Sequence, residues 1–362
     1  MGTGLKKEDS AALKGLAILL MIWHHCYYKI AKFGRYDVIF RGITQEQMIR
    51  IALCFKICVA IFAFVSGYGL MYGYSKNTSR KDSKAVSGWT VGHLVSTGSG
   101  YWFVAVLSYL VYAVLKGGNF AKWGETKGEK LFAIFADILG IGKLTGTKSL
   151  NGAWWYMSAA LVFILLVPVL YTVLEKWGAV VCTGLIFLFP RITGIGFPGG
   201  TSLVSFLMIF VVGMICCKYD FFTWFHRLGN KKKVLRIGKA VLLFLCLAAA
   251  FWMYHKLKMK VIWEYQYAFV PFLTIVFCVE YLFRIPWISK IFQFLGRHSM
   301  NIWLVHTFVR DYMGKLVFSV KEFWLIPFVI LLISLAASYV IEFLKKVTGY
   351  KKLTQHIQQK LR

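Results

Sequence analysis

The chain has 362 residues, of which 58% are hydrophobic and 16% charged, and a formal net charge of +28. Soluble globular domains carry about 25% charged residues, so this composition excludes a soluble domain and indicates an integral membrane protein. The lysines and arginines are scattered between apolar stretches and form no DNA- or RNA-binding motif, which excludes nucleic-acid partners. We assign the charge to contacts with anionic membrane lipids, with a second contribution from an anionic substrate at the membrane face. The eight cysteines show no zinc-binding spacing, so no metal site is predicted.

The first apolar run of the chain opens on Lys14 and ends on His24 and His25. On a helix, Lys14 and His25 lie on one face, about 16 Å apart along the axis, while His24 points to another side. If Lys14 lies at the edge of a hydrocarbon layer about 30 Å thick, His25 lies near its middle, where a titratable group indicates function. A histidine at the far interface is the second interpretation. Lys6 and Lys7 resemble the start of a signal peptide, but no small-residue cleavage site follows, so we expect a retained helix.

Apolar stretches long enough to cross a membrane recur along nearly the whole chain. We predict an all-α polytopic membrane protein with about ten transmembrane helices, at residues 11–30, 48–74, 91–115, 153–174, 178–190, 201–217, 235–254, 261–283, 297–317 and 324–344. They form one domain over residues 1–346, followed by a short basic tail, 347–362. The stretch 130–142 is expected to be an interfacial helix or a buried half-helix. Ten spans put both termini on one side, and charge-rich segments such as 284–297 fall there too, so that side is predicted to be cytoplasmic.

The ninth predicted span carries a further histidine. It starts near Arg297, and Ser299 and His306 lie seven residues apart, on nearly one helix face. His306 then lies at a depth comparable to that of His25, and two histidines from different helices at one depth indicate a shared cavity. The alternative, in which His306 bonds a neighbouring helix and serves only packing, stays open.

The second and fourth spans carry groups that each have two interpretations. Ser66 and Gly67 are small residues, for which close helix packing is favoured. Lys56 lies on the same span and must snorkel, pair with an acid or line water. Trp154 and Trp155 open the fourth span, where an aromatic belt at the outer interface is favoured and a platform for stacking carbohydrate is the alternative.

Taken together, these stretches resemble the acyltransferase-3 family of bacterial membrane acyltransferases, which modify surface sugars and lipids. The main match is the run Leu13-Lys14-Gly15-Leu16-Ala17 followed by His25, which resembles the family's basic-residue, ten-spacer, histidine signature. Lys14 stands where the family generally has arginine, and lysine lacks the bidentate fork that suits phosphate or carboxylate. Supporting matches are Phe64-Val65-Ser66-Gly67-Tyr68, Trp154-Trp155-Tyr156 with Pro168, Phe210-Val211-Val212-Gly213, and the run from Gly296 to His306.

The resemblance implies an acyl-CoA donor, usually acetyl-CoA, which arrives from the cytoplasm as a substrate and is not a permanently bound cofactor. It implies an acceptor hydroxyl on a cell-surface polysaccharide or its lipid-linked precursor, and a location in the inner membrane of a bacterial cell. His25 is implied to be the catalytic histidine. As a neutral imidazole it would take the proton from the hydroxyl that attacks the thioester. A covalent acyl-histidine relay is the other route and stays open.

The remaining site residues are predicted from depth, charge and side of the membrane. A donor for the oxyanion is needed, and Ser299, Asn301 and His306 are the catalytic candidates beside His25. Arg80, Lys81 and Lys84 are chosen for the CoA phosphates only by charge and side. The full set predicted to bind substrate or CoA is Lys14, His24, Ser66, Arg80, Lys81, Lys84, Trp154 and Trp155.

Two other classes of protein share these features. A transporter or flippase for a lipid-linked glycan also uses many helices, basic faces and buried polar groups. A membrane scaffold or sensor is the third class, and it predicts no dependence on any single histidine. Replacement of His25 by alanine separates the classes, because an acyltransferase loses sugar acylation while the polymer still reaches the surface.

Overall fold

The computed structural model describes residues 4–77, 82–194, 201–229, 232–254, 256 and 263–360. These residues are almost entirely helical, and apart from one isolated bridge between Ile39 and Glu322 no strand occurs among them, which confirms the all-α prediction. The elements in chain order are α1 (Lys7–Tyr27), η1 (Ile30–Lys32), α2 (Gln45–Cys54), α3 (Ile57–Asn77), α4 (Ser83–Leu115), η2 (Ala121–Trp123), α5 (Lys127–Leu139), α6 (Gly142–Thr145), η3 (Gly152–Trp154), α7 (Trp155–Thr193), α8 (Val204–Lys218), α9 (Phe221–Arg227), α10 (Lys233–Met253), η4 (Tyr265–Phe269), α11 (Val270–Glu280), η5 (Leu282–Arg284), α12 (Pro286–Arg297), α13 (Ser299–Tyr312), α14 (Gly314–Val317), η6 (Phe318–Val320), α15 (Ile326–Val347) and α16 (Tyr350–Lys360).

Six helical segments of the described chain are long and apolar enough to cross a membrane, or seven if the bent pair α8 and α9 counts as one span. The chain is therefore a polytopic membrane protein, and the predicted number of ten spans is not confirmed. Helices α1 and α13 are not among the six, and α13 has only 14 residues. The predicted fourth and fifth spans form one helix, α7, which breaks at Gly178, where φ is 76°. A positive φ of this kind is favourable only for glycine.

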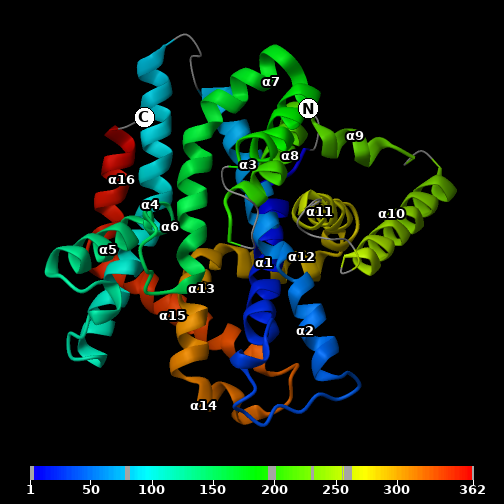
Figure 1. Cartoon of the computed structure of the whole chain (residues 1–362). Helices are drawn as coiled ribbons and strands as arrows, with labels where there is room; N and C mark the ends of the chain where they lie inside the picture. Colours follow the sequence, from blue (N-terminus) through cyan, green and yellow to red (C-terminus); the bar gives the residue numbers. More distant parts are fainter. Residues whose placement is uncertain are drawn as a thin grey trace.

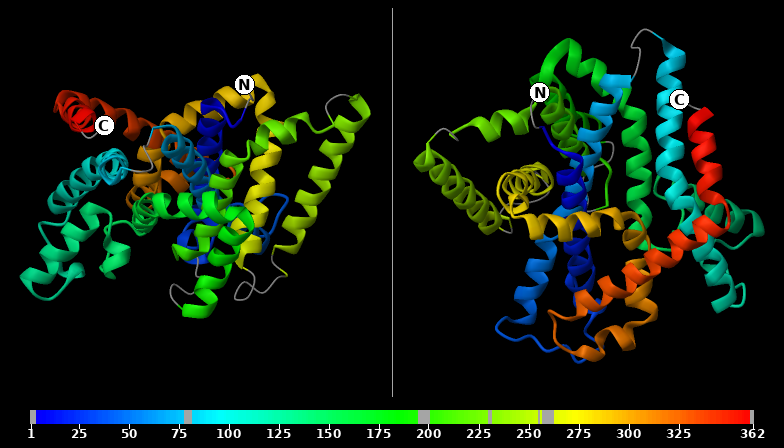
Figure 2. Two further views of the ribbon diagram at one scale, coloured as in Figure 1. Left: turned by 90° about the horizontal axis from the view of Figure 1, so that it is seen from above. Right: turned by 180° about the vertical axis from the view of Figure 1, so that it is seen from behind.

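Helices α1 and α3 form the centre of the bundle (Figures 1 and 2), where α1 packs closely on α12 and α3 on α8. On α1, Gly15 lies against the backbone of α12, and Gly296 of α12 lies in turn against the backbone of α1. Gly67 of α3 and Gly213 of α8 contact each other's helices in the same way. A Cβ at any of these four positions would meet a backbone carbonyl, so the small residues let the helices approach closely. The packing interpretation of Gly67 is confirmed.

One segment of the structure differs from the sequence prediction, and another agrees with it and adds detail. The segment 284–297, expected as a charge-rich connection, contains the amphipathic helix α12, which packs along α1. The short apolar stretch at 130–142 corresponds to α5, which Thr126 caps at its start and Gly140 ends in the left-handed conformation. Its apolar side chains Leu131 and Phe132 are exposed, as expected of a helix at a membrane interface.

Helix α10 lies apart from the central bundle in both views of Figure 2. Leu243 and Ala250 are its buried side chains, and most of its other apolar side chains are exposed. A helix that is apolar all round and little covered by protein is suited to lipid contact. The two chain ends lie toward the same end of the molecule (Figure 1), as the predicted topology requires.

Candidate active site

A cavity of about 620 Å³ lies among α1, α3, α4, α7 and α13. Binding sites for small molecules are commonly ~300–1,000 Å³ in volume. The cavity is lined by residues from both the first and the ninth predicted spans, including Lys14, His25 and Ser299. One face of α1 and one face of α13 therefore border the same cavity.

His25 lines this cavity, and His306 contacts the His25 ring without lining the cavity itself. The prediction that two histidines share the cavity therefore holds for His25 and not for His306. Their ring centroids are 5.0 Å apart, and the ring planes are tilted by 51°. His306 is only 1% exposed, and its Nδ1 donates to the carbonyl of Trp303 at 2.8 Å, within its own helix. Because a carbonyl only accepts, Nδ1 carries the proton and Nε2 keeps a lone pair. That Nε2 is buried and has no hydrogen-bond partner within the described residues.

Arg310 lies one helical turn after His306 and was not singled out from the sequence. Its Nη1 donates to the His25 carbonyl at 2.8 Å, and its Nε and Nη2 bind the two oxygens of Asp311 at 2.7 and 2.8 Å. The guanidinium is 4% exposed and borders the cavity. The spacing His306 to Arg310, four residues on one helix face, was the signal available in the sequence. Arg310 links α13 to the end of α1 and so positions the two histidines.

His24 borders the cavity as well as anchoring α1. Its Nδ1 donates to the Ala52 carbonyl of α2 at 2.7 Å, and its ring stacks on Tyr28 with centroids 5.0 Å apart. The sequence predicted that His24 points to another side of the helix than His25, but both residues line the cavity. Lys56 also lines the cavity, which is one of the three outcomes that the sequence left open for it.

Lys14 lines the cavity together with several small hydroxyl side chains. Ser66 of α3, Thr97 of α4 and Ser299 of α13 border the same space. Lys14 is half-buried, and no acidic side chain pairs with it in the parts of the chain that the structure describes. A half-buried, unpaired cation suits an anionic ligand. The structure thus brings Lys14, Ser66, Ser299 and His25 to one cavity.

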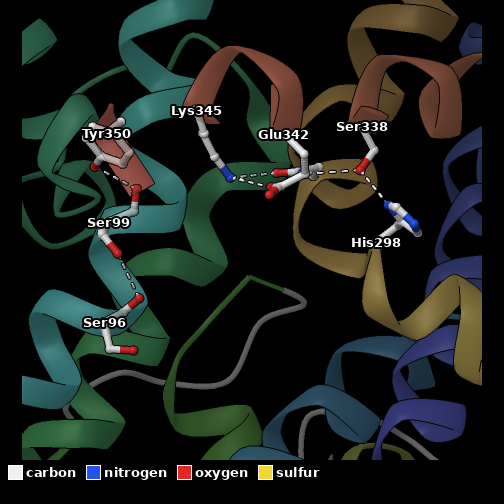
Figure 3. Close-up of polar contacts among 8 residues, drawn as sticks. Ser96, Ser99, His298, Ser338, Glu342, Lys345 and Tyr350 are labelled. Carbon is white, nitrogen blue, oxygen red and sulfur yellow. Dashed lines mark hydrogen bonds and ion pairs between the residues drawn. The ribbon is translucent and has the colours of Figure 1, made fainter. Parts of the chain in front are cut away.

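Asn301 does not line this cavity. Its Nδ2 donates to Ser338 Oγ and to Glu342 Oε1, both at 3.0 Å, and its Oδ1 accepts from Lys345 Nζ at 3.3 Å. Figure 3 shows this network between α13 and α15, with His298 also bound to Ser338. Asn301 was chosen from depth alone, which does not tell one face of the helix from another.

Trp154 and Trp155 differ in their burial and in their position relative to the cavity. Trp154 is 2% exposed, and its Nε1 donates to the Leu304 carbonyl at 3.1 Å, so it packs in the interior and forms neither an interfacial belt nor a stacking platform. Trp155 is half-buried and borders the cavity, as does Tyr156. Of the predicted pair, only Trp155 is in a position to contact a ligand there.

Of the three residues nominated for the CoA phosphates, the structure describes Lys84. Arg80 and Lys81 lie outside the described residues. Lys84 is exposed in the first turn of α4 and does not border the cavity. Its backbone nitrogen donates to Asp82, which caps the helix. Lys84 remains a candidate only for a contact outside the cavity.

Asp137 of α5 holds the loop that forms one wall of the cavity. Its carboxylate accepts from Ser149 Oγ at 2.6 Å, from the Leu150 nitrogen at 2.7 Å and from Tyr109 OH at 2.8 Å. Burial raises the pKa of Asp137, and these hydrogen bonds oppose the rise. Leu150 and Asn151 of this loop line the cavity, so α5 positions a wall of the site without entering it.

Comparison with known proteins identifies the family. A family model described as an acyltransferase domain (Acyl_transf_3) matches residues 10–343, nearly the whole chain. Neither a curated protein nor a solved structure matches it. The matched range includes every residue that lines the cavity, from Lys14 to Tyr312. The chain is a membrane acyltransferase and belongs to the acyltransferase-3 family.

Proposed function

We propose that the protein transfers an acyl group, acetyl in the first instance, from acetyl-CoA to a hydroxyl of a cell-surface polysaccharide or its lipid-linked precursor. The observation that carries this proposal is His25, which lines the cavity together with an unpaired lysine, Lys14, and whose ring contacts the buried His306. In the proposed orientation both termini are in the cytoplasm of a bacterial cell, so the donor enters from the Lys14 end.

The histidine pair has the chemistry for proton transfer. His306 Nε2 keeps a lone pair that can accept an N–H from His25, which leaves the other nitrogen of His25 free to act as a base. The acceptor oxygen then attacks the thioester carbon, the carbon–sulfur bond breaks, and the hydroxyl proton passes through His25 to the CoA sulfur. General base catalysis of this kind contributes about 10²- to 10⁴-fold in rate.

The remaining groups have supporting roles in this proposal. Lys14 attracts the anionic CoA molecule, and the Ser299 hydroxyl, which borders the cavity, donates to the oxyanion that forms on the thioester carbonyl. Lysine offers a point charge at this position, where arginine would give a bidentate fork. The rings of Trp155 and Tyr156 are available for stacking on the sugar.

Replacement of His25 by alanine in the producing cells tests the proposal. We expect the surface polysaccharide to lose its acyl groups, read by proton NMR, while the amount of polymer at the surface stays normal. Loss of the polymer itself would favour a flippase, and unchanged acylation with normal protein levels would refute the proposal.

A further inference from the structure

The cavity continues past His25, away from Lys14. Lys32 follows His25 in the chain, Lys56 lies beside His24, and Arg310 and Asp311 come after His306; all four line the cavity. Helices α1 and α13 run in the same direction (Figure 1), so Lys32, Arg310 and Asp311 lie at the end opposite to Lys14. We call these four residues, Lys32, Lys56, Arg310 and Asp311, the charged end.

The charged end has an excess of positive charge. Arg310 and Asp311 neutralise each other through a bidentate pair. Lys32 and Lys56 are both half-buried, and neither forms an ion pair with any residue in the described ranges. Three cations against one carboxylate leave a net charge of +2 at this end.

Two half-buried lysines without acidic partners are unfavourable in the free protein. Burial lowers the pKa of Lys32, the neighbouring Arg310 guanidinium lowers it further, and the Asp311 carboxylate opposes this fall. A bound anion would add to the effect of Asp311, because it brings a further negative charge to a region where the cations are in excess. The geometry therefore points to an anionic group as the ligand of this end.

The two ends of the cavity suit the two substrates differently. The donor thioester must reach His25 from the Lys14 end, so the nucleotide phosphates remain on that side. The charged end is left for the acceptor. We propose that the acceptor hydroxyl belongs to a sugar carrying a carboxylate or a phosphate, and that Lys32 and Lys56 bind this anionic group. This inference rests on the proposed acyl transfer.

An anionic acyl group is the competing ligand. A dicarboxylic acyl chain on the thioester would extend past His25 and bring its free carboxylate toward Lys56. The acceptor is favoured because Lys32 follows the end of α1 and lines the cavity past His25, on the side opposite to Lys14.

The experiment compares surface glycans from cells with and without the gene. Two-dimensional proton–carbon NMR identifies which sugar residue loses its acyl group and which acyl group is lost. A carbonyl carbon at C6 of that residue marks a carboxylate, and a proton–phosphorus correlation marks a phosphate. We expect one of the two on the acylated residue. A lost acyl group on a neutral sugar without phosphate overturns the inference, and so does a lost dicarboxylic acyl group on such a sugar.

Variants then connect the anionic group to the two lysines. The double variant Lys32→Gln, Lys56→Gln is expected to lose at least 90% of the acylation, whereas the double arginine variant, which keeps the charges, retains most of it. Lys315→Gln, an exposed lysine of α14 outside the cavity, is the matched control and is expected to have no effect. Full acylation by the glutamine double variant overturns the inference. If deletion of the gene changes no glycan acylation at all, the proposed function itself has failed.

Discussion

The two faces of α13 use polar side chains in opposite ways. Toward α15, Asn301 uses both its amide nitrogen and its oxygen in hydrogen bonds, and Lys345 and Glu342 complete the network. Toward α1, His306 Nε2 and Thr307 Oγ1 are buried without partners among the described residues. Buried polar groups in proteins are nearly always hydrogen-bonded, so the unsatisfied face indicates where a ligand binds, and the satisfied face indicates what holds the helix in place.

The largest effect is expected on the unsatisfied face. His306→Ala should lower kcat for acyl transfer by about 10²-fold or more, because in the proposed mechanism the Nε2 of His306 accepts the N–H of His25. The melting temperature of the purified protein in detergent should hardly change, since Nδ1 bonds only carbonyls of its own helix. A large fall in melting temperature with normal activity in the folded fraction would make His306 a packing residue.

The satisfied face should respond in the opposite way. Asn301→Ala removes one hydrogen-bond partner from Lys345 and one from Glu342. This loss should cost about 1–3 kcal/mol of folding free energy. We expect a lower melting temperature and a kcat within twofold of the wild type. A severe loss of kcat at an unchanged melting temperature would contradict this and would return Asn301 to the catalytic set.

Arg310 combines the two cases, since it borders the cavity yet its hydrogen bonds are satisfied. Arg310→Lys keeps the charge but cannot bind Asp311 and the His25 carbonyl together. Loss of one such charged hydrogen bond is worth about 1.5–3 kcal/mol, and we expect part of it to appear as a roughly tenfold lower kcat because His25 shifts. Unchanged kinetics would show that Arg310 does not position His25.

The smallest effect is expected at the start of α13. Ser299→Ala removes one hydroxyl from the cavity wall and should lower kcat severalfold with no change in KM for acetyl-CoA, if Ser299 binds the oxyanion. A change in KM alone would place Ser299 in donor binding instead. Steady-state release of the CoA thiol measures both quantities.

Much of the site could be predicted because helical periodicity relates spacing to depth. The positions of Lys14, His25 and Ser299 along their helices were enough to place them at one cavity, whereas His306 contacts the His25 ring without lining the cavity. Periodicity within one helix does not say which neighbour each face meets, and Asn301 and Trp154 were misplaced relative to the cavity for that reason.

The contacts between helices also escaped sequence reasoning. Arg310 becomes informative only when the end of α1 is known to lie beside it. The helical class and the polytopic arrangement followed from apolar composition. The helix α12 did not, because its amphipathic sequence resembles a charge-rich connection, and its close packing on α1 at Gly15 cannot be seen from that sequence.

The central claim is that His25 carries out the chemistry inside this cavity. The most direct measurement is the rate of acetyl transfer from labelled acetyl-CoA to the purified native glycan, with wild-type protein and His25→Ala in lipid vesicles. A fall of at least about 10²-fold is predicted, with the same melting temperature and the same affinity for CoA. A rate within threefold of the wild type, from equally folded protein, would contradict the account.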